Sequence, residues 1–136
     1  MQFAFRKYAP SIALIRCRDG ERAVEYLENR GEFACGESWI APPFVLLDLN
    51  LPRMSGHEVL EYIRHSAHSR SLPVVIFTSS SNPKEVASCY RSGANSYFIK
   101  PFDLGKMTSL MEMLIRYWLQ DAQLPAYIGL TLPAPG

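Results

Sequence analysis

The sequence has almost no net charge, few cysteines and no long hydrophobic run. Fourteen Lys and Arg against thirteen Asp and Glu give a formal net charge of +1 over 136 residues, which argues against a nucleic-acid or anionic-membrane partner. No apolar run approaches the ~20 residues of a membrane-spanning helix, and the N-terminus lacks the apolar core of a signal peptide. Cys17, Cys35 and Cys89 are far apart and have no metal-binding spacing. We therefore expect reduced thiols and a cytoplasmic protein.

Apolar residues make up 48% of the chain, enough for one buried core. Short apolar runs alternate with helical patterns, which is typical of parallel βαβ units. The expected strands are 12–17, 44–47, 73–77 and 96–99, of which 44–47 is expected to be the most buried. The sequence therefore predicts an α/β fold with a doubly wound parallel sheet. The predicted domain spans residues 1–121, and residues 122–136 form a Pro-rich tail.

The helices are predicted from their capping residues. In a capping box, a side chain at the helix start and a Glu three residues later bind backbone amides that have no partner within the helix. We expect capping boxes at Ser55 with Glu58 and at Asn82 with Glu85. Further helices are expected from Asp19 to about Gly31, up to a terminating Gly93, and from Asp103 to about Gln120.

Three predicted strands end at residues that suit phosphoryl transfer, namely Asp48, Thr78 and Lys100. The carboxyl ends of parallel strands form the functional edge of such a sheet. A carboxylate can become an aspartyl phosphate, and a hydroxyl and an ammonium can bind phosphoryl oxygens. A carboxylate beside a phosphoryl group also implies Mg²⁺. Each residue alone is more often a cap, a strand-end residue or a solvated charge, so the prediction depends on their coincidence.

The segments around these residues carry a family resemblance. Residues 46–56 (LLDLNLPRMSG), 75–79 (VIFTS) and 93–102 (GANSYFIKPF) resemble the motifs of bacterial response-regulator receiver domains, which have a flavodoxin-like fold. The long loop before Asp48 and the Pro-rich tail resemble stand-alone regulators paired with phytochrome-type sensor kinases.

The resemblance implies a role for each matching residue. Asp48 would accept a phosphoryl group from a sensor histidine kinase or a phosphotransfer protein, and Thr78 and Lys100 would bind it. Asp48 and the backbone carbonyl of Asn50 would hold Mg²⁺. Tyr97 would be a switch whose rotamer follows Thr78, and the Lys100–Pro101 peptide bond would be cis. Such a domain is not an enzyme, and we expect it to signal by protein contact.

One family feature is missing from the sequence. Receiver domains carry two adjacent acidic residues at the end of a first strand, where they hold Mg²⁺, yet no Asp or Glu precedes Asp19. Residues 1–9 resemble the family's first helix, so the first strand is expected to be absent. We therefore expect weak Mg²⁺ binding and slow phosphorylation.

The same residues are compatible with functions other than phosphoryl acceptance. The main alternative is a degenerate receiver that acts as a phosphorylation-independent interaction module. A hydrolase of the haloacid dehalogenase type is disfavoured because it needs a carboxylate at the position of Asn50. A nicotinamide-binding domain is disfavoured because no GxGxxG follows a strand.

The last predicted helix carries two apolar stripes. The first is expected to pack on the sheet and contains Leu104, Met107, Met111, Leu114 and Trp118. The second contains Leu110, Met113 and Tyr117, and predicts either a homodimer through this helix or a helix buried under the tail.

Overall fold

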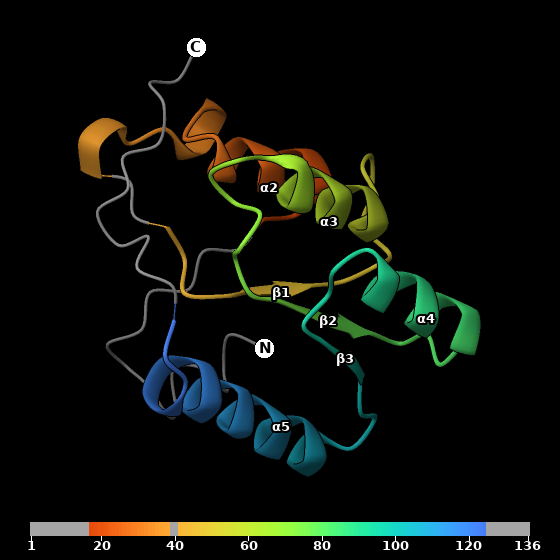
Figure 1. The fold of residues 1–136 in the computed structure, drawn as a ribbon. Helices are drawn as coiled ribbons and strands as arrows, with labels where there is room; N and C mark the ends of the chain where they lie inside the picture. Colours follow the sequence, from red (N-terminus) through yellow and green to blue (C-terminus); the bar gives the residue numbers. More distant parts are fainter. Residues whose placement is uncertain (1–16, 39–40, 125–136) are drawn as a thin grey trace. The chain divides into compact units, whose positions relative to one another are not determined.

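The computed structural model describes residues 17–38 and 41–124, which form two compact units (Figure 1). One unit, within residues 17–99, contains helices α2 (Gly20–Leu27), α3 (Gly56–His65) and α4 (Pro83–Arg91), strands β1 (Val45–Leu47), β2 (Val74–Thr78) and β3 (Ser96–Ile99), and the short 3₁₀ helices η1 (Gly31–Phe33) and η2 (Gly36–Ser38). The other, described for residues 100–124, contains α5 (Leu104–Arg116) and its π-helical continuation η3 (Tyr117–Asp121). The helix predicted over 1–9, the strand predicted over 12–17 except for its last residue, and the tail from Pro125 lie outside the described residues.

The described strands form one parallel sheet in the order β1-β2-β3. This confirms the predicted α/β fold and three of the four predicted strands. The prediction that residues 44–47 are the most buried strand is wrong: only Leu47 is buried there, whereas every residue of β2 is buried. β2 has a described partner strand on each edge, and β1 has one.

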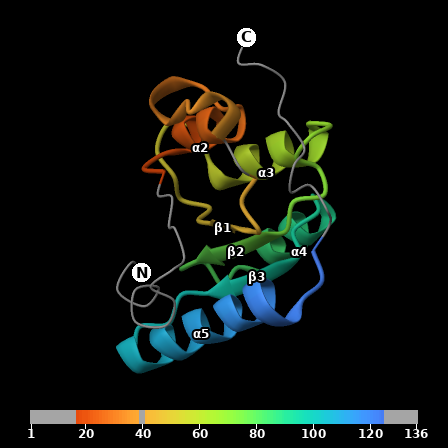
Figure 2. The same ribbon diagram turned by 90° about the vertical axis from the view of Figure 1, so that its left-hand side faces the viewer.

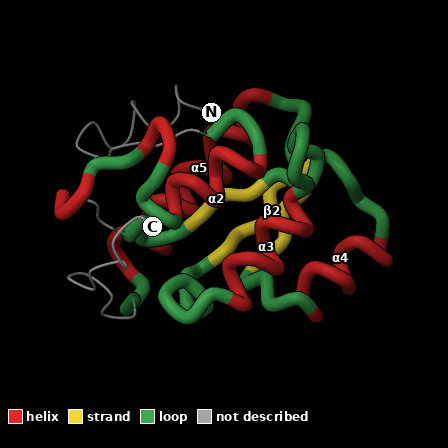
Figure 3. Tube along the Cα trace, turned by 90° about the horizontal axis from the view of Figure 1, so that it is seen from above, coloured by secondary structure: helices red, strands yellow, loops and turns green. Residues whose placement is uncertain are grey.

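The core of this unit lies between the sheet and its helices. Alternate residues of β2, Val74 and Ile76, belong to a buried cluster with Val59, Leu60 and Ile63 of α3. Helices α2 and α3 contact each other above the sheet (Figure 2), and α3 lies over β2 when seen from above (Figure 3). Because side chains alternate along a strand, Thr78 lies on the same face of β2 as Val74 and Ile76.

The helices begin at the predicted capping residues. Asp19, Ser55, Asn82 and Asp103 each accept a hydrogen bond from a backbone N–H in the first turn of their helix. The second capping box is only half formed, because the carboxylate of Glu85 accepts a hydrogen bond from the Ser80 hydroxyl.

Helix α2 ends at Leu27, earlier than the predicted end near Gly31. Asn29 takes the left-handed conformation that ends the helix (φ 54°), a position that asparagine tolerates. Its buried side chain accepts a hydrogen bond from the backbone N–H of Cys35 (2.9 Å) and donates one to the carbonyl of Gly36 (2.8 Å). Asn29 therefore ends the helix and anchors the loop that follows.

Arg64 joins α3 to the turn before β3. Its Nε donates to the carbonyl of Gly93 (2.8 Å), and its two terminal nitrogens donate to the carbonyl of Leu72 (2.7 Å) and to Oδ1 of Asn95 (2.8 Å). Gly93 has a φ of 99° and ends α4, as predicted.

We expect Arg64→Lys to lower the free energy of unfolding by about 2 kcal/mol, because an ammonium cannot reach these acceptors with the geometry of a planar guanidinium. Urea unfolding measures the change. Arg70→Lys, at an exposed side chain, is the matched control and should change stability by less than about 0.5 kcal/mol. Equal stability of the two variants would contradict the structural role of Arg64.

The buried side of α5 differs in part from the predicted stripe. Met111 and Leu114 are buried as predicted, together with Ile115, which the prediction omitted. Leu104 is 73% exposed because it directly follows the N-cap Asp103 and starts the first turn. The other two members of the predicted stripe, Met107 and Trp118, are half-buried.

Candidate functional site

Asp48 and Thr78 lie at the carboxyl edge of the sheet. β1 and β2 are parallel, with Leu47 opposite Ile76. Asp48 directly follows β1, and Thr78 is the last residue of β2. The structure therefore brings a carboxylate and a hydroxyl from neighbouring strands to one edge, as the sequence predicts.

The half-buried carboxylate of Asp48 is oriented by the backbone after it. The N–H of Asn50 donates to Asp48 Oδ1 (3.0 Å), a turn in which an aspartate bonds the amide two residues on. The same peptide segment carries the carbonyl of Asn50, which the family resemblance implies as a metal ligand.

Gly56 permits a close approach of α3 to this segment. Its N–H donates to the carbonyl of Leu49 (3.1 Å). A Cβ at this position would lie 2.2 Å from the carbonyl oxygen of Asp48 and 2.6 Å from Leu49 Cα. Only glycine fits here, so the start of α3 fixes the backbone that carries Asp48.

Thr78 has an unusual polar environment. Its side chain is fully buried, and Oγ1 has no hydrogen-bond partner among the described residues. Burying an unpaired hydroxyl costs about 1–3 kcal/mol, and such groups in a native protein often serve a functional site. The hydroxyl lies at the end of β2, where a bound oxygen-rich group would supply the partner.

Tyr97 of β3 is linked to the segment after Thr78. Its hydroxyl donates to the backbone carbonyl of Ser80 (2.9 Å), and its ring packs against the core cluster. Burial raises the pKa of the Tyr97 hydroxyl, so it stays protonated and able to donate this hydrogen bond at neutral pH. The structure therefore connects the predicted switch residue to the loop that begins at Thr78; sequence reasoning missed Ser80 as the connecting residue.

Lys100 directly follows Ile99, the end of β3, and is the first residue of the unit described over 100–124. The prediction of a cis Lys100–Pro101 bond is wrong, because this bond is trans. The trans form is the default, since a cis bond before proline costs about 0.5–1 kcal/mol and needs surrounding structure to hold it.

Asp19 has a structural use in α2. It accepts from the backbone N–H of Arg22 (2.8 Å) as the N-cap, and Oδ2 lies 4.0 Å from Nε of Arg53. Arg53 is in the left-handed region (φ 66°), and its guanidinium is 3.5 Å from Glu21. Across residues 17–38 and 41–124, no three His, Cys, Asp or Glu side chains are grouped to hold a metal ion. The described site thus offers one carboxylate, that of Asp48, for a metal.

Comparison with known proteins decides the family. The sequence model of the response regulator receiver domain matches residues 3–112. The chain belongs to the response regulator receiver domain family. Response regulator Rcp1 of Synechocystis is 35% identical over 113 residues, covering 83% of this chain and 75% of Rcp1. The probable methanogenesis regulatory protein FilR2 of Methanothrix harundinacea is 40% identical over 102 residues, covering 75% of this chain and 63% of FilR2.

Solved structures agree with this receiver fold. The phosphorylated cyanobacterial phytochrome response regulator RcpA has a TM-score of 0.84 and 31% identity, with 92% of this chain and 87% of RcpA covered. The Mn²⁺-bound form of Rcp1 has a TM-score of 0.81 and 31% identity, with 92% of this chain and 91% of Rcp1 covered. These similarities confirm the predicted flavodoxin-like receiver fold and the predicted likeness to regulators of the phytochrome type.

Two further findings concern a partial sequence match and the helices of this receiver domain. A probable cyclic di-GMP phosphodiesterase of Vibrio cholerae is 38% identical over 65 residues, which cover 48% of this chain and 15% of that protein. Among the described helices of this receiver domain, none has the length and apolar character to cross a membrane.

Proposed function

We propose that this receiver domain accepts a phosphoryl group on Asp48 from a sensor histidine kinase or a phosphotransfer protein and signals by protein contact. The buried Thr78 hydroxyl carries this proposal, because it lies without a described partner at the same sheet edge as Asp48. The phosphorylated relative RcpA supports it. The phosphorylation-independent module is not favoured, since the acceptor, the hydroxyl and the aromatic residue are all retained.

The proposed transfer follows from the chemistry of these groups. An oxygen of Asp48 attacks the phosphorus of a phosphohistidine, the P–O bond forms as the P–N bond breaks, and the leaving imidazole nitrogen takes up a proton. The Thr78 hydroxyl donates to a phosphoryl oxygen. Lys100, placed after β3 by the sequence, neutralises the negative charge of the phosphoryl group.

Mg²⁺ is the proposed cofactor, as the Mn²⁺-bound Rcp1 structure also suggests. Asp48 and the carbonyl of Asn50 are oxygen donors of the kind Mg²⁺ prefers, and Mg²⁺ sites often use one or two carboxylates with waters and phosphate. When bound, the ion offsets the repulsion between the carboxylate and the phosphoryl oxygens.

We expect Mg²⁺ to bind with a dissociation constant of about 1 mM or weaker, because one carboxylate supplies most of the protein charge at this site. Titration followed by amide NMR shifts around Asp48 measures the affinity. Asp48→Asn should remove the response, and Asp121→Asn, at an exposed residue, should leave it unchanged. Micromolar affinity in the parent protein would contradict this donor set.

Tyr97 is the proposed switch. Its hydrogen bond to the Ser80 carbonyl supports this role, because movement of Thr78 toward a phosphoryl oxygen displaces the segment that anchors Tyr97. We also propose that the receiver domain ends at residue 121 and that residues 122–136 form a tail. A cytoplasmic location is supported by the free cysteines Cys17, Cys35 and Cys89.

The proposed homodimer uses the second stripe of α5 and η3. Met113 and Tyr117 are 45% and 53% exposed, and Leu110 is half-buried. The same stripe of a second copy would cover the exposed side chains of Met113 and Tyr117. We expect a dimer in sedimentation at tens of micromolar that Leu110→Glu dissociates and that Ser109→Glu, the same charge at the exposed neighbouring residue, leaves intact. A monomeric parent protein would contradict the dimer.

Incubation with acetyl phosphate and millimolar Mg²⁺ tests the proposed function. Intact mass should show slow labelling that reaches only a fraction of the chains, with at most one phosphoryl group per chain. This labelling should be lost in Asp48→Asn and after chelation of Mg²⁺, and retained in Asp121→Asn. Labelling that survives Asp48→Asn would overturn the proposal.

A further inference from the structure

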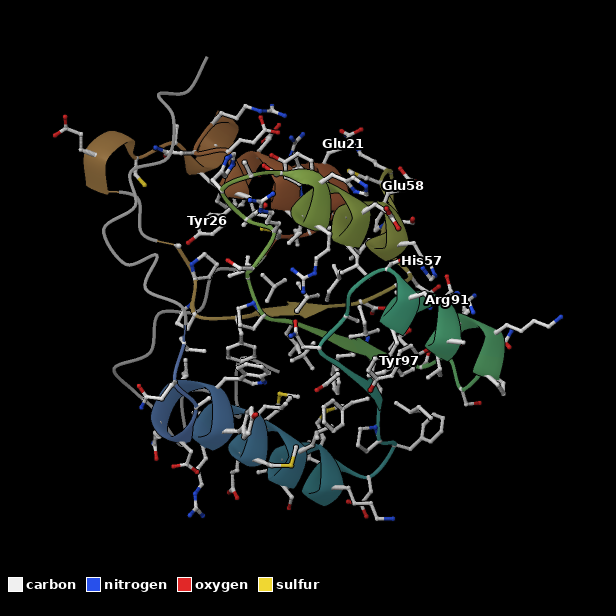
Figure 4. All side chains as sticks on the ribbon, viewed as in Figure 1. Glu21, Tyr26, His57, Glu58, Arg91 and Tyr97 are labelled. Atoms are coloured by element: carbon white, nitrogen blue, oxygen red, sulfur yellow. The ribbon has the colours of Figure 1, made fainter. Side chains whose placement is uncertain are left out.

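A chain of polar contacts connects α3 to the anchor of Tyr97. On α3, His57 Nε2 lies 3.8 Å from Glu85 Oε1 of α4. The other carboxylate oxygen of Glu85 accepts from the Ser80 hydroxyl, and the Ser80 carbonyl accepts from the Tyr97 hydroxyl (2.9 Å). In Figure 4, His57 extends from α3 toward α4, whereas Glu58 points away. All these residues belong to the unit within 17–99.

The two oxygens of Glu85 therefore have different partners. One side of the carboxylate holds the hydroxyl of Ser80, two residues after Thr78, and the other faces an imidazole. The side chains of His57 and Glu85 are each 37% exposed, so solvent reaches both. At 3.8 Å the imidazole of His57 is too distant for a good hydrogen bond, so its attraction to Glu85 depends on the positive charge.

Besides His57 and Glu85, two titratable side chains take part in these contacts, those of Cys89 and Tyr97. Nδ1 of His57 lies 3.9 Å from Sγ of Cys89. Burial and the negative charge of Glu85 raise the pKa of the Cys89 thiol, and burial raises the pKa of Tyr97, so both stay protonated near neutral pH. On α3 itself, Glu61 is one turn away and pairs with His65 (3.5 Å). Histidine side chains ordinarily titrate between about pH 6 and 7.

We propose that Glu85 and His57 are positioning residues for the switch, forming a proton-sensitive latch that holds the segment after Thr78 in the arrangement that anchors Tyr97. When His57 is protonated, its attraction for one oxygen of Glu85 fixes the carboxylate and keeps the other oxygen on Ser80. When His57 is neutral, the carboxylate is free to rotate away, and the Ser80 segment and Tyr97 move more readily. The latch therefore tightens at acidic pH and loosens as the pH rises.

This inference rests on Tyr97 acting as the switch, so the experiment reports on both. The full chain is labelled with 3-fluorotyrosine, and the ¹⁹F resonance of Tyr97 is assigned by its loss in Tyr97→Phe. Two series are recorded: a pH titration without phosphoryl analogue, and addition of beryllofluoride with Mg²⁺ at fixed pH. The variants are His57→Asn, Glu85→Gln and Ser80→Ala. His65→Asn is the matched control, because it removes a histidine of the same helix that also pairs with a glutamate.

The latch predicts that the Tyr97 resonance of the parent protein titrates with a single inflection between about pH 6 and 7. The inflection should be lost in His57→Asn, Glu85→Gln and Ser80→Ala and retained in His65→Asn. A Tyr97 resonance independent of pH, or an unchanged inflection in His57→Asn, would overturn the latch. If Tyr97 still responds to beryllofluoride in that case, the latch is wrong and the proposed switch stands. If Tyr97 responds to pH and not to beryllofluoride, the contact from His57 to Tyr97 is sensitive to protons, but the proposed switch is wrong and the latch has no role in it.

Discussion

Gly56→Ala is expected to lower the free energy of unfolding by about 3 kcal/mol, because the added methyl group meets backbone that cannot move aside. The new Cβ would lie 2.2 Å from the carbonyl oxygen of Asp48 and 2.6 Å from Leu49 Cα. Relief requires α3 to move away from the segment that orients the Asp48 carboxylate. The same substitution should therefore also slow phosphorylation.

Urea unfolding measures the loss, and Gly105→Ala is the matched control. In α5, the added Cβ of Gly105 would meet only the Asp103 side chain, at 3.1 Å. Alanine favours helix over glycine by about 1 kcal/mol, so the control should be as stable as the parent or more stable. If Gly56→Ala is no less stable than Gly105→Ala, the close approach of α3 to Asp48 is wrong.

Thr78→Val is expected to separate stability from function. Valine has nearly the shape of threonine and removes a buried hydroxyl that has no described partner, so the free energy of unfolding should rise by about 1 kcal/mol. Phosphorylation of Asp48 by acetyl phosphate should slow by about 10²-fold, the effect of removing one positioned donor.

Thr78→Ser makes the opposite comparison. Serine keeps the hydroxyl and leaves a methyl-sized void, so stability should fall by about 1 kcal/mol while phosphorylation stays within about threefold of the parent rate. Urea unfolding and intact mass over time measure the two quantities. A Thr78→Val protein that is labelled as fast as the parent would contradict the role of the hydroxyl.

Local sequence signals predicted most of the fold. Ser55, Asn82 and Asp103 cap their helices as expected, because a cap depends on a side chain and the amides two or three residues away. Gly93 ends α4 because its φ of 99° favours glycine. For the end of α2, the same preference of glycine for the left-handed region predicts Gly31. The helix ends earlier because Asn29 enters this region, which the prediction omits because the preference of asparagine for the region is weaker than that of glycine.

Features that depend on distant parts of the chain were predicted less well. The burial of a strand depends on its neighbours in the sheet, which an apolar run such as 44–47 does not reveal. For the site, the residue types placed Asp48 and Thr78 at one edge, as observed. The roles of Ser80 and Glu85 could not be predicted, because Glu85 fits a capping box in sequence and in the structure binds the Ser80 hydroxyl instead.

The central claim is that the Asp48 carboxylate accepts the phosphoryl group, and locating the acyl phosphate tests it most directly. The chain is treated with acetyl phosphate and millimolar Mg²⁺, reduced with borohydride to convert an aspartyl phosphate to homoserine, and mapped by peptide mass spectrometry. We predict homoserine at position 48 and at no other Asp. An unmodified Asp48 together with homoserine elsewhere, or with phosphate on another side chain, would contradict the proposed function.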